Sequence, residues 1–141
     1  MIAVDTNVLV HAHREESPKH AAAYARIVAL AEGKFPWAIP VFCLAEFLRI
    51  ITHPRVFDPP HSVKEAVTAL QRLLKSPSLA VLVPGPRFAE LLIDAVLEAE
   101  ALGNLVFDAQ VVAVCREGGV GRLITEDRDF DRFKDFATER L

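Results

Sequence analysis

Four acidic side chains interrupt segments of the sequence that are otherwise apolar. Asp5 directly follows the apolar run Ile2–Val4, and Glu46 lies inside the segment VFCLAEFLRII. Asp108 lies in LVFDAQVVAV, and Asp127 comes two residues after the apolar run that ends at LIT. A carboxylate that leaves water must find a cation or hydrogen-bond donors. The arrangement of these four acids is therefore the first clue to chemistry.

If the four carboxylates converge, they require cations or protons. Two carboxylates about 4 Å apart repel by roughly 4 kcal/mol at an effective dielectric constant of about 20. We expect this repulsion to raise at least one of the four pKa values when no metal is bound. Oxygen ligands favour Mg²⁺ or Mn²⁺ over zinc. A carboxylate-held Mg²⁺ pair supports in-line displacement at phosphorus, because it activates water and stabilises charge on the attacking and leaving oxygens.

Each acid also has a purely structural interpretation. Glu46 could form an i,i+3 ion pair with Arg49, and Asp108 could be a favourable acid near a helix N-terminus. Asn104, one turn before Asp108, is explained by a cap on the helix that follows. Glu126 and Asp129 could belong to a solvated loop or cap the turn that begins at Phe130.

Zinc chemistry is not expected. Cys43 and Cys115 lie in apolar stretches far apart in the sequence, which predicts buried free thiols. The five histidines show no zinc-ligand spacing with these cysteines.

Short apolar runs predict the strands that would position the acids. Ile2–Val4 is apolar on both faces, as expected of a central parallel strand, and residues 122–125 form a similar run that also ends next to acids. Residues 79–83 form a third apolar run, bounded by prolines, that predicts a buried strand. Residues 35–39 read as a connection that could contain a short extended piece, and the tail from Phe136 as a weak edge strand. Because ligands bind at the carboxyl ends of parallel strands, Asp5 and Asp127 are predicted to share one sheet edge.

Helical periodicity predicts the segments between these strands. One helix is expected from the Ser17–Pro18 cap to Gly33, and another from Pro40 to about Thr52. Ser62 and Glu65 form a capping box for a helix with a buried stripe, which comprises Val63, Ala66, Val67, Leu70 and Leu74. The longest helix is expected from Pro86 to Gly103, followed by a helix over residues 105–117. Alternating strands and helices without hairpin signals predict an α/β fold with a parallel sheet.

Composition sets broad limits on the function. A chain of 141 residues with 52% hydrophobic residues is typical of one globular domain. No apolar run reaches the roughly 18 residues that span a bilayer, and no secretory signal is recognisable, so we expect a cytoplasmic protein without a membrane segment. The net charge of -3 argues against a generally basic nucleic-acid binder. If four carboxylates hold a metal, however, the rest of the chain is close to neutral.

Taken in order, these motifs resemble those of PIN-domain ribonucleases, specifically the VapC toxins of type II toxin-antitoxin systems. The matching pieces are DTN at residues 5–7, the helix-borne Glu46, GNLVFDAQVVA around Asp108, and TEDRDF at residues 125–130. The resemblance covers essentially the whole length, so residues 1–141 are expected to form a single PIN domain. It implies a three-layer α/β/α fold with a short twisted parallel sheet of about four to five strands.

The resemblance also implies an activity and partners. It implies Mg²⁺-dependent endonuclease cleavage of RNA, with Mn²⁺ as a possible substitute, inhibition by a cognate VapB antitoxin, and a homodimer. The acidic quartet would be Asp5, Glu46, Asp108 and Asp127, with supporting roles for Thr6, Asn7, Asn104, Thr125 and Asp129. We expect Asp5 and Asp108 to hold the principal ion, while Asp127 and Asp129 could exchange ligand roles.

Two other function classes remain open at the level of sequence. A phosphatase with an aspartyl nucleophile, of the haloacid dehalogenase kind, also begins with an acid after its first strand. It requires a second Asp two residues later, and this chain has Asn7 there. A catalytically idle binding module would instead use the acids to hold a structural ion or an arginine of a partner.

Overall fold

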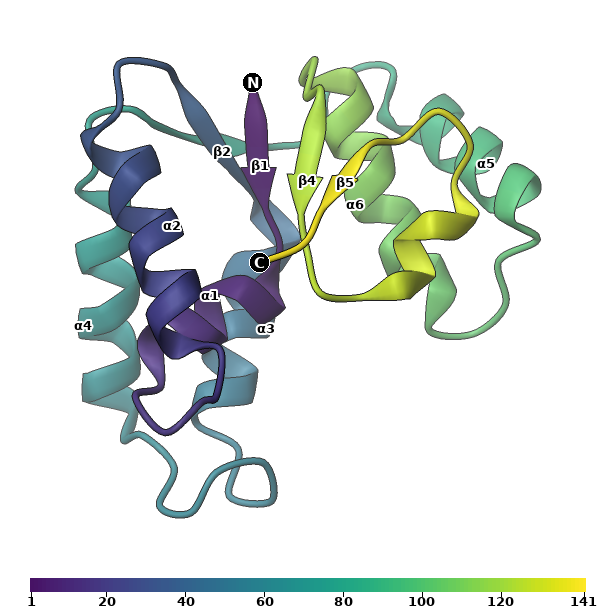
Figure 1. Cartoon of the computed structure of the whole chain (residues 1–141). Helices are drawn as coiled ribbons and strands as arrows, with labels where there is room; N and C mark the ends of the chain where they lie inside the picture. The colour runs from purple at the N-terminus through teal and green to yellow at the C-terminus, as the bar shows by residue number, and fades with distance from the viewer.

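In a computed structural model that describes residues 1–141, five short strands form one parallel sheet in the order β3-β2-β1-β4-β5 (Figure 1). The strands are β1 (Ile2–Val4), β2 (Trp37–Pro40), β3 (Leu79–Leu82), β4 (Arg122–Ile124) and β5 (Thr138–Glu139). The strands expected near the N-terminus, at residues 79–83 and 122–125, and in the tail are thus confirmed. β1 lies at the centre of the sheet, paired with β2 on one side and β4 on the other.

Six helices flank the sheet and make the fold three-layered. They are α1 (Thr6–His13), α2 (His20–Glu32), α3 (Val41–Ile51), α4 (Val63–Leu74), α5 (Phe88–Ala99) and α6 (Leu105–Glu117). Figure 1 shows α1 to α4 together on one side of the sheet and α5 and α6 on the other. A short 3₁₀ helix, η1 (Arg128–Arg132), follows β4. The α/β class with a parallel sheet is therefore confirmed. None of the helices is long and apolar enough to cross a bilayer.

Three elements near the N-terminus differ from the sequence-based expectation. The segment 35–39 is not merely a connection, because β2 pairs with both β1 and β3 and all four of its residues are buried. α2 begins at His20 rather than at Pro18, because the Ser17 hydroxyl accepts from the Lys19 amide, 3.2 Å away, within a turn that precedes the helix. α1 was not predicted at all, and it begins immediately after Asp5.

The predicted boundaries in the second half of the chain are also corrected. α5 ends at Ala99 and not at Gly103, because Glu100 adopts a left-handed conformation with φ of 50°. With 12 residues α5 is not the longest helix, since α2 and α6 each have 13. Leu102, inside the predicted range, lies beyond the end of α5 and is 85% exposed.

The capping box of α4 is confirmed, but its predicted stripe is only partly buried. Both hydrogen bonds between Ser62 and Glu65 are present. Ala66 is buried, together with Ala69, whereas three members of the stripe are exposed: Val63, Val67 and Leu74. α4 packs mainly against α3, so only its narrow alanine face is covered.

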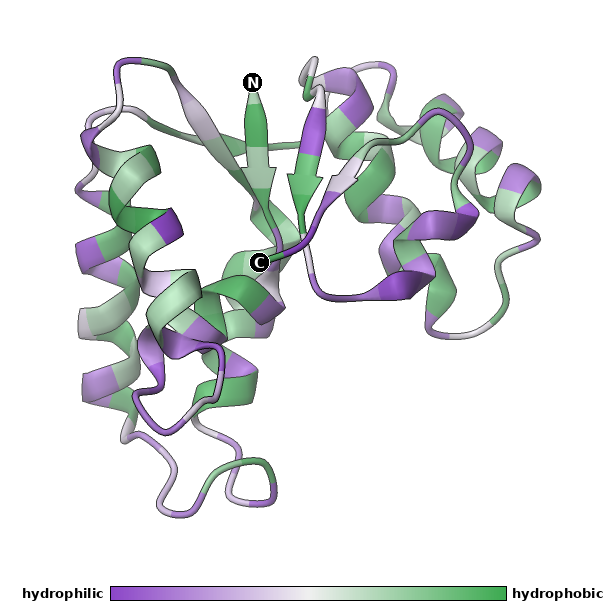
Figure 2. Cartoon of the chain, in the orientation of Figure 1, coloured by the Kyte–Doolittle hydropathy of each residue, from purple (hydrophilic) through white to green (hydrophobic).

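The core lies where the strands meet α6 and the helices on the opposite face. Figure 2 shows β1 as hydrophobic along its length, and β4 as changing from a hydrophilic start to a hydrophobic end. Leu123 and Ile124 are fully buried, whereas Arg122 is exposed. Cys43 and Cys115 are buried free thiols, as predicted. β1 and β4, the two strands that run toward the acidic residues, are thus held in place by buried apolar side chains.

Candidate active site

The carboxyl ends of β1 and β4 lie side by side, so the residues that follow them meet at one edge of the sheet. Val4 pairs with Ile124, and the Asp5 amide donates to the Ile124 carbonyl at 3.0 Å. Asp5 and Thr125 therefore face each other across the ends of two central strands. This confirms that the two strands deliver polar side chains to a common edge.

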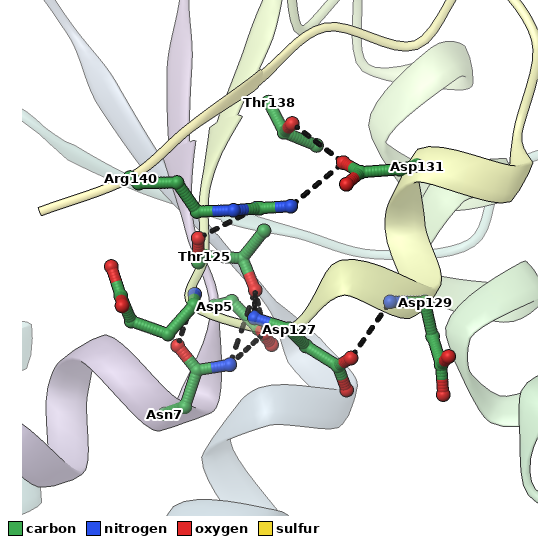
Figure 3. Close-up of polar contacts among 9 residues, drawn as sticks. Asp5, Asn7, Thr125, Asp127, Asp129, Asp131, Thr138 and Arg140 are labelled. Atoms are coloured by element: carbon green, nitrogen blue, oxygen red, sulfur yellow. Dashed lines mark hydrogen bonds and ion pairs between the residues drawn. The ribbon is translucent and has the colours of Figure 1, made fainter.

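Asp5 is held rigidly, because donors occupy both of its carboxylate oxygens. One oxygen accepts from the Thr6 amide at 2.7 Å. The other accepts from the Asn7 amide group at 2.6 Å and from the Thr125 hydroxyl at 2.7 Å (Figure 3). Asp5 is only 6% exposed. As the N-terminal cap of α1, it also lies near the positive end of that helix.

Burial is the main reason why the pKa of Asp5 is raised to about 6. Hydrogen bonds from Thr125 and Thr6 oppose this rise, and the charges of Glu46 and Asp127 add to it. Burial together with the Asp5 charge holds the pKa of the Cys43 thiol well above its usual range. Cys43 is therefore a neutral thiol, with its sulfur 3.8 Å from an Asp5 oxygen.

Glu46 reaches the site from α3 and keeps one side open to solvent. Its carboxylate accepts from the Thr6 hydroxyl at 2.7 Å, which links α3 to the start of α1. It also lies 3.6 Å from Arg49, so the expected i,i+3 pair exists, but both side chains are about half exposed. Such an exposed pair contributes little stability, and it does not account for the direction in which Glu46 points.

Asp108 lies in the first turn of α6 and is half-buried. Burial is the largest cause that raises its pKa to about 7, followed by the charges of Asp127 and Asp5. A raised pKa was expected for at least one of the acids. For Asp108, however, burial contributes more to the rise than repulsion between the carboxylates does. Asn104 is the N-cap residue of α6, as predicted, but its side chain makes no cap hydrogen bond. Its side chain instead lines the same pocket as Asp108.

Asp127 and Asp129 come from the turn between β4 and η1. The Asp127 amide donates to the Thr125 hydroxyl at 3.0 Å, and its carboxylate accepts from the Asp129 amide at 2.8 Å (Figure 3). Carboxylate oxygens of Asp108, Asp127 and Asp129 lie within 4.8 Å of one another. Asp129 thus belongs to the same cluster as Asp127 and Asp108. Glu126 points elsewhere, since it pairs with Lys19.

The acids share one pocket of about 840 Å³. All four members of the quartet line it, together with Asp129 and Asn104, whereas Thr6, Asn7 and Thr125 lie behind it and bond to the acids. Five carboxylates face a single basic side chain, Arg49, and no histidine, lysine or cysteine lines the pocket. An all-oxygen donor set with uncompensated negative charge fits a hard divalent cation.

Several pocket residues were not anticipated from the sequence. Phe107, which is 62% exposed, precedes Asp108 on α6, and Phe42 approaches from α3. Gln110 and Val111 complete the α6 wall. The signal available in the sequence was an aromatic residue directly before a site acid, but an apolar residue in an apolar helix is ordinarily read as core.

Comparisons with known proteins agree with this architecture. The family model described as PIN domain matches residues 2–135. The chain is 36% identical over 134 residues to Ribonuclease VapC43 of Mycobacterium tuberculosis, covering 95% of this chain and 90% of that protein. It is 35% identical over 133 residues to Ribonuclease VapC31 of the same species, covering 94% and 93%.

Solved structures show the same fold at lower identity. VapBC2 from Rickettsia felis, bound to a DNA fragment from its promoter, superposes with a TM-score of 0.73 at 20% identity, covering 99% of this chain and 98% of that one. Mycobacterium tuberculosis VapC20, a Sarcin-Ricin loop cleaving toxin, gives 0.69 at 18% identity, covering 96% and 98%. From the matched family model and the full-length relatives, we conclude that this chain belongs to the PIN domain family, within its VapC ribonuclease branch.

Proposed function

We propose that the protein is a Mg²⁺-dependent endoribonuclease that acts as the toxin of a toxin-antitoxin module. One observation carries the proposal: five carboxylates and a single arginine line one pocket at the carboxyl edge of the sheet. Two of these acids, Asp5 and Asp108, have pKa values raised to about 6 and about 7. Full-length similarity to proteins named as VapC ribonucleases supports RNA as the substrate.

The proposed metal ligands are the quartet of Asp5, Glu46, Asp108 and Asp127, with Asp129 close enough to replace or assist Asp127. The bound ion would supply water activation and charge stabilisation for hydrolysis of a phosphodiester bond. The protein's own contribution is positional. Thr125 and Asn7 fix Asp5, and Thr6 fixes Glu46, so both carboxylates are oriented before any cation arrives.

The phosphatase alternative fits the geometry poorly. Asn7, which stands where a second acid would be needed, donates its amide to Asp5 and accepts from the Glu126 amide at 3.0 Å. An amide side chain engaged in this way cannot act as a general acid. The idle-module alternative keeps the same pocket but predicts metal binding without cleavage, so an activity measurement separates it from the ribonuclease.

The test is cleavage of a mixed RNA substrate by purified protein, freed of any antitoxin, in Mg²⁺, in Mn²⁺ and in excess EDTA. We expect cleavage with either cation and none in EDTA. Asp5→Asn should abolish cleavage, whereas Asp94→Asn, which removes an exposed acid on α5, should leave it unchanged. Equal cleavage by the wild type in EDTA would exclude the metal-dependent mechanism, and Mg²⁺ binding without cleavage would favour the idle module.

A VapB-type antitoxin is the proposed partner. The solved structures of VapBC and FitAB assemblies share this fold. An antitoxin arginine inserted among the acids would form charge-assisted, bidentate hydrogen bonds. If so, the product of the adjacent reading frame should bind wild-type protein tightly and bind Asp108→Asn and Asp127→Asn variants more weakly. Unchanged affinity across these variants would rule out arginine insertion.

We also propose that the protein forms a homodimer. α5 and the turn after it expose apolar side chains that a second copy could cover, namely Ile93, Leu97 and Leu102. Light scattering on the purified chain should give twice the monomer mass. Leu97→Glu should shift this mass toward the monomer, and a monomeric wild type at micromolar concentration would contradict the proposal.

A further inference from the structure

Arg140 lies directly after β5, and its side chain reaches back to the segment that carries two site acids. One guanidinium nitrogen donates to the Thr125 carbonyl at 2.8 Å. The other terminal nitrogen donates to the Asp131 carboxylate at 2.7 Å. Figure 3 shows the Arg140 side chain lying between these two acceptors, above Asp127 in this view. Arg140 thus holds both ends of residues 125–131.

The first of these contacts falls on a residue that links several parts of the site. The Thr125 hydroxyl donates to Asp5 at 2.7 Å, and it accepts from the Asp127 amide at 3.0 Å and from Asn7 at 3.1 Å. Thr125 has no exposed surface. A buried carbonyl must be hydrogen bonded, and β5 ends at Glu139, one residue before Arg140. The Arg140 side chain therefore supplies a donor where the strand has ended.

The second contact fixes the other end of the same segment. Asp131 belongs to η1, and its carboxylate also accepts from the Thr138 hydroxyl at 3.2 Å. Asp127 and Asp129 lie between the two anchored residues, and neither forms a hydrogen bond or ion pair with Arg140. A guanidinium group is planar and presents its donors in a fixed arrangement, which a lysine ammonium cannot reproduce. Arg140 therefore sets the distance between Thr125 and Asp131.

We propose that Arg140 is a positioning residue for cation binding. It holds the 125–131 segment so that Asp127 and Asp129 remain beside Asp108, and it acts through Thr125 and Asp131 rather than by contact with the ion or with RNA. This inference rests on the proposed function, because it presupposes that the acids bind Mg²⁺. Removing a residue that hydrogen bonds to a metal ligand, without touching the metal itself, commonly changes metal affinity or activity by about 10- to 100-fold.

The test is titration of the full-length protein with Mg²⁺ alone, followed by calorimetry, for Arg140→Gln and Arg140→Lys. We expect both variants to bind Mg²⁺ about tenfold more weakly than the wild type. The Mg²⁺ concentration for half-maximal RNA cleavage should rise by a similar factor, while the rate at saturating Mg²⁺ changes less. Asp131→Asn, which removes only one anchor, should weaken binding in the same direction and by a smaller factor.

Arg122→Gln is the matched control. Arg122 lies on β4 and forms an ion pair with Glu139 of β5 at 3.1 Å, so it also ties the tail to the sheet, but it forms no hydrogen bond or ion pair with residues 125–131. This variant should bind Mg²⁺ as the wild type does. A lower melting temperature with unchanged Mg²⁺ affinity in the Arg140 variants would assign Arg140 a merely structural role and overturn the inference.

The outcomes separate this inference from the proposed function. If wild-type protein binds no Mg²⁺, the proposed function and the inference fail together. If the wild type binds Mg²⁺ and the folded Arg140 variants bind it equally well, only the inference fails. Should Arg140→Gln not fold, as judged by circular dichroism, Arg140→Lys and Asp131→Asn decide the question. If both of these variants bind Mg²⁺ with wild-type affinity, the inference is also overturned.

Discussion

Asp108→Asn should stabilise the metal-free protein at pH 8, although it should abolish activity. The folded structure raises the pKa of Asp108 from 3.8 to about 7, so ionisation at pH 8 costs folding free energy. In a fully buried group this rise would be worth about 4 kcal/mol. Because Asp108 is only half-buried, solvent screening reduces the expected gain to about 1 to 2 kcal/mol.

The size of this effect depends on pH. A carboxyl group whose pKa is raised by folding favours the folded state while it is protonated, and this contribution is lost as pH rises from about 4 to about 7. The variant lacks this titration. The difference in stability between Asp108→Asn and the wild type should therefore be small near pH 4 and reach its full size above pH 7.

Thermal melts in EDTA at pH 5 and pH 8 measure this difference. For a chain of this size, each 1 kcal/mol corresponds to about 4 °C in melting temperature. Asp94→Asn, an exposed acid on α5, controls for the loss of a negative charge. Mg²⁺ should raise the melting temperature of the wild type at pH 8 and change that of the variant less. A variant that melts below the wild type in EDTA at pH 8 would refute the reasoning.

Three further predictions follow from the geometry. Thr125→Val should slow RNA cleavage by about 10- to 100-fold, because it removes the hydroxyl that bonds Asp5, whereas Thr125→Ser should retain most of the rate. At low Mg²⁺ the cleavage rate should rise between about pH 5 and pH 8, since Asp5 and Asp108 must lose protons to bind a cation, and more Mg²⁺ should move this rise to lower pH. A pH profile unaffected by Mg²⁺ would contradict this. Arg14→Ala should lower the free energy of unfolding in urea by about 2 kcal/mol without weakening Mg²⁺ binding, because Arg14 is buried, donates to the Pro59 carbonyl at 3.2 Å and lies 4.0 Å from the Phe57 ring centre. Weaker Mg²⁺ binding in this variant would show that the arginine also supports the site.

Features that depend on residues close together in the sequence were predictable. The capping box of Ser62 and Glu65 follows from two side chains three residues apart, and the strands at 2–4 and 122–124 follow from short apolar runs. The extent of β2 was not predictable in this way. Its pairing with two neighbouring strands, rather than its own composition, makes it a full member of the sheet.

The same contrast applies to the site. The acids stood out because a carboxylate in an apolar segment needs an explanation, and Asp5, Glu46, Asp108 and Asp127 do line one pocket. Arg140 carried no such signal, because an arginine in a polar tail looks like any surface residue. Its contact with the Thr125 carbonyl joins residues 15 positions apart and depends on β5 lying beside β4. Only the assembled sheet reveals it.

The most direct test of the central claim is an RNA cleavage assay in which Mg²⁺ is returned to EDTA-treated protein. Wild-type chain and Asp5→Asn chain are purified identically and free of antitoxin, so that a contaminating nuclease would appear in both. We predict no cleavage by either protein without Mg²⁺ and cleavage by the wild type alone once Mg²⁺ is restored. Cleavage by the wild type that persists without Mg²⁺, or equal cleavage by both proteins with Mg²⁺, would contradict the account of the acidic pocket as a metal-dependent ribonuclease site.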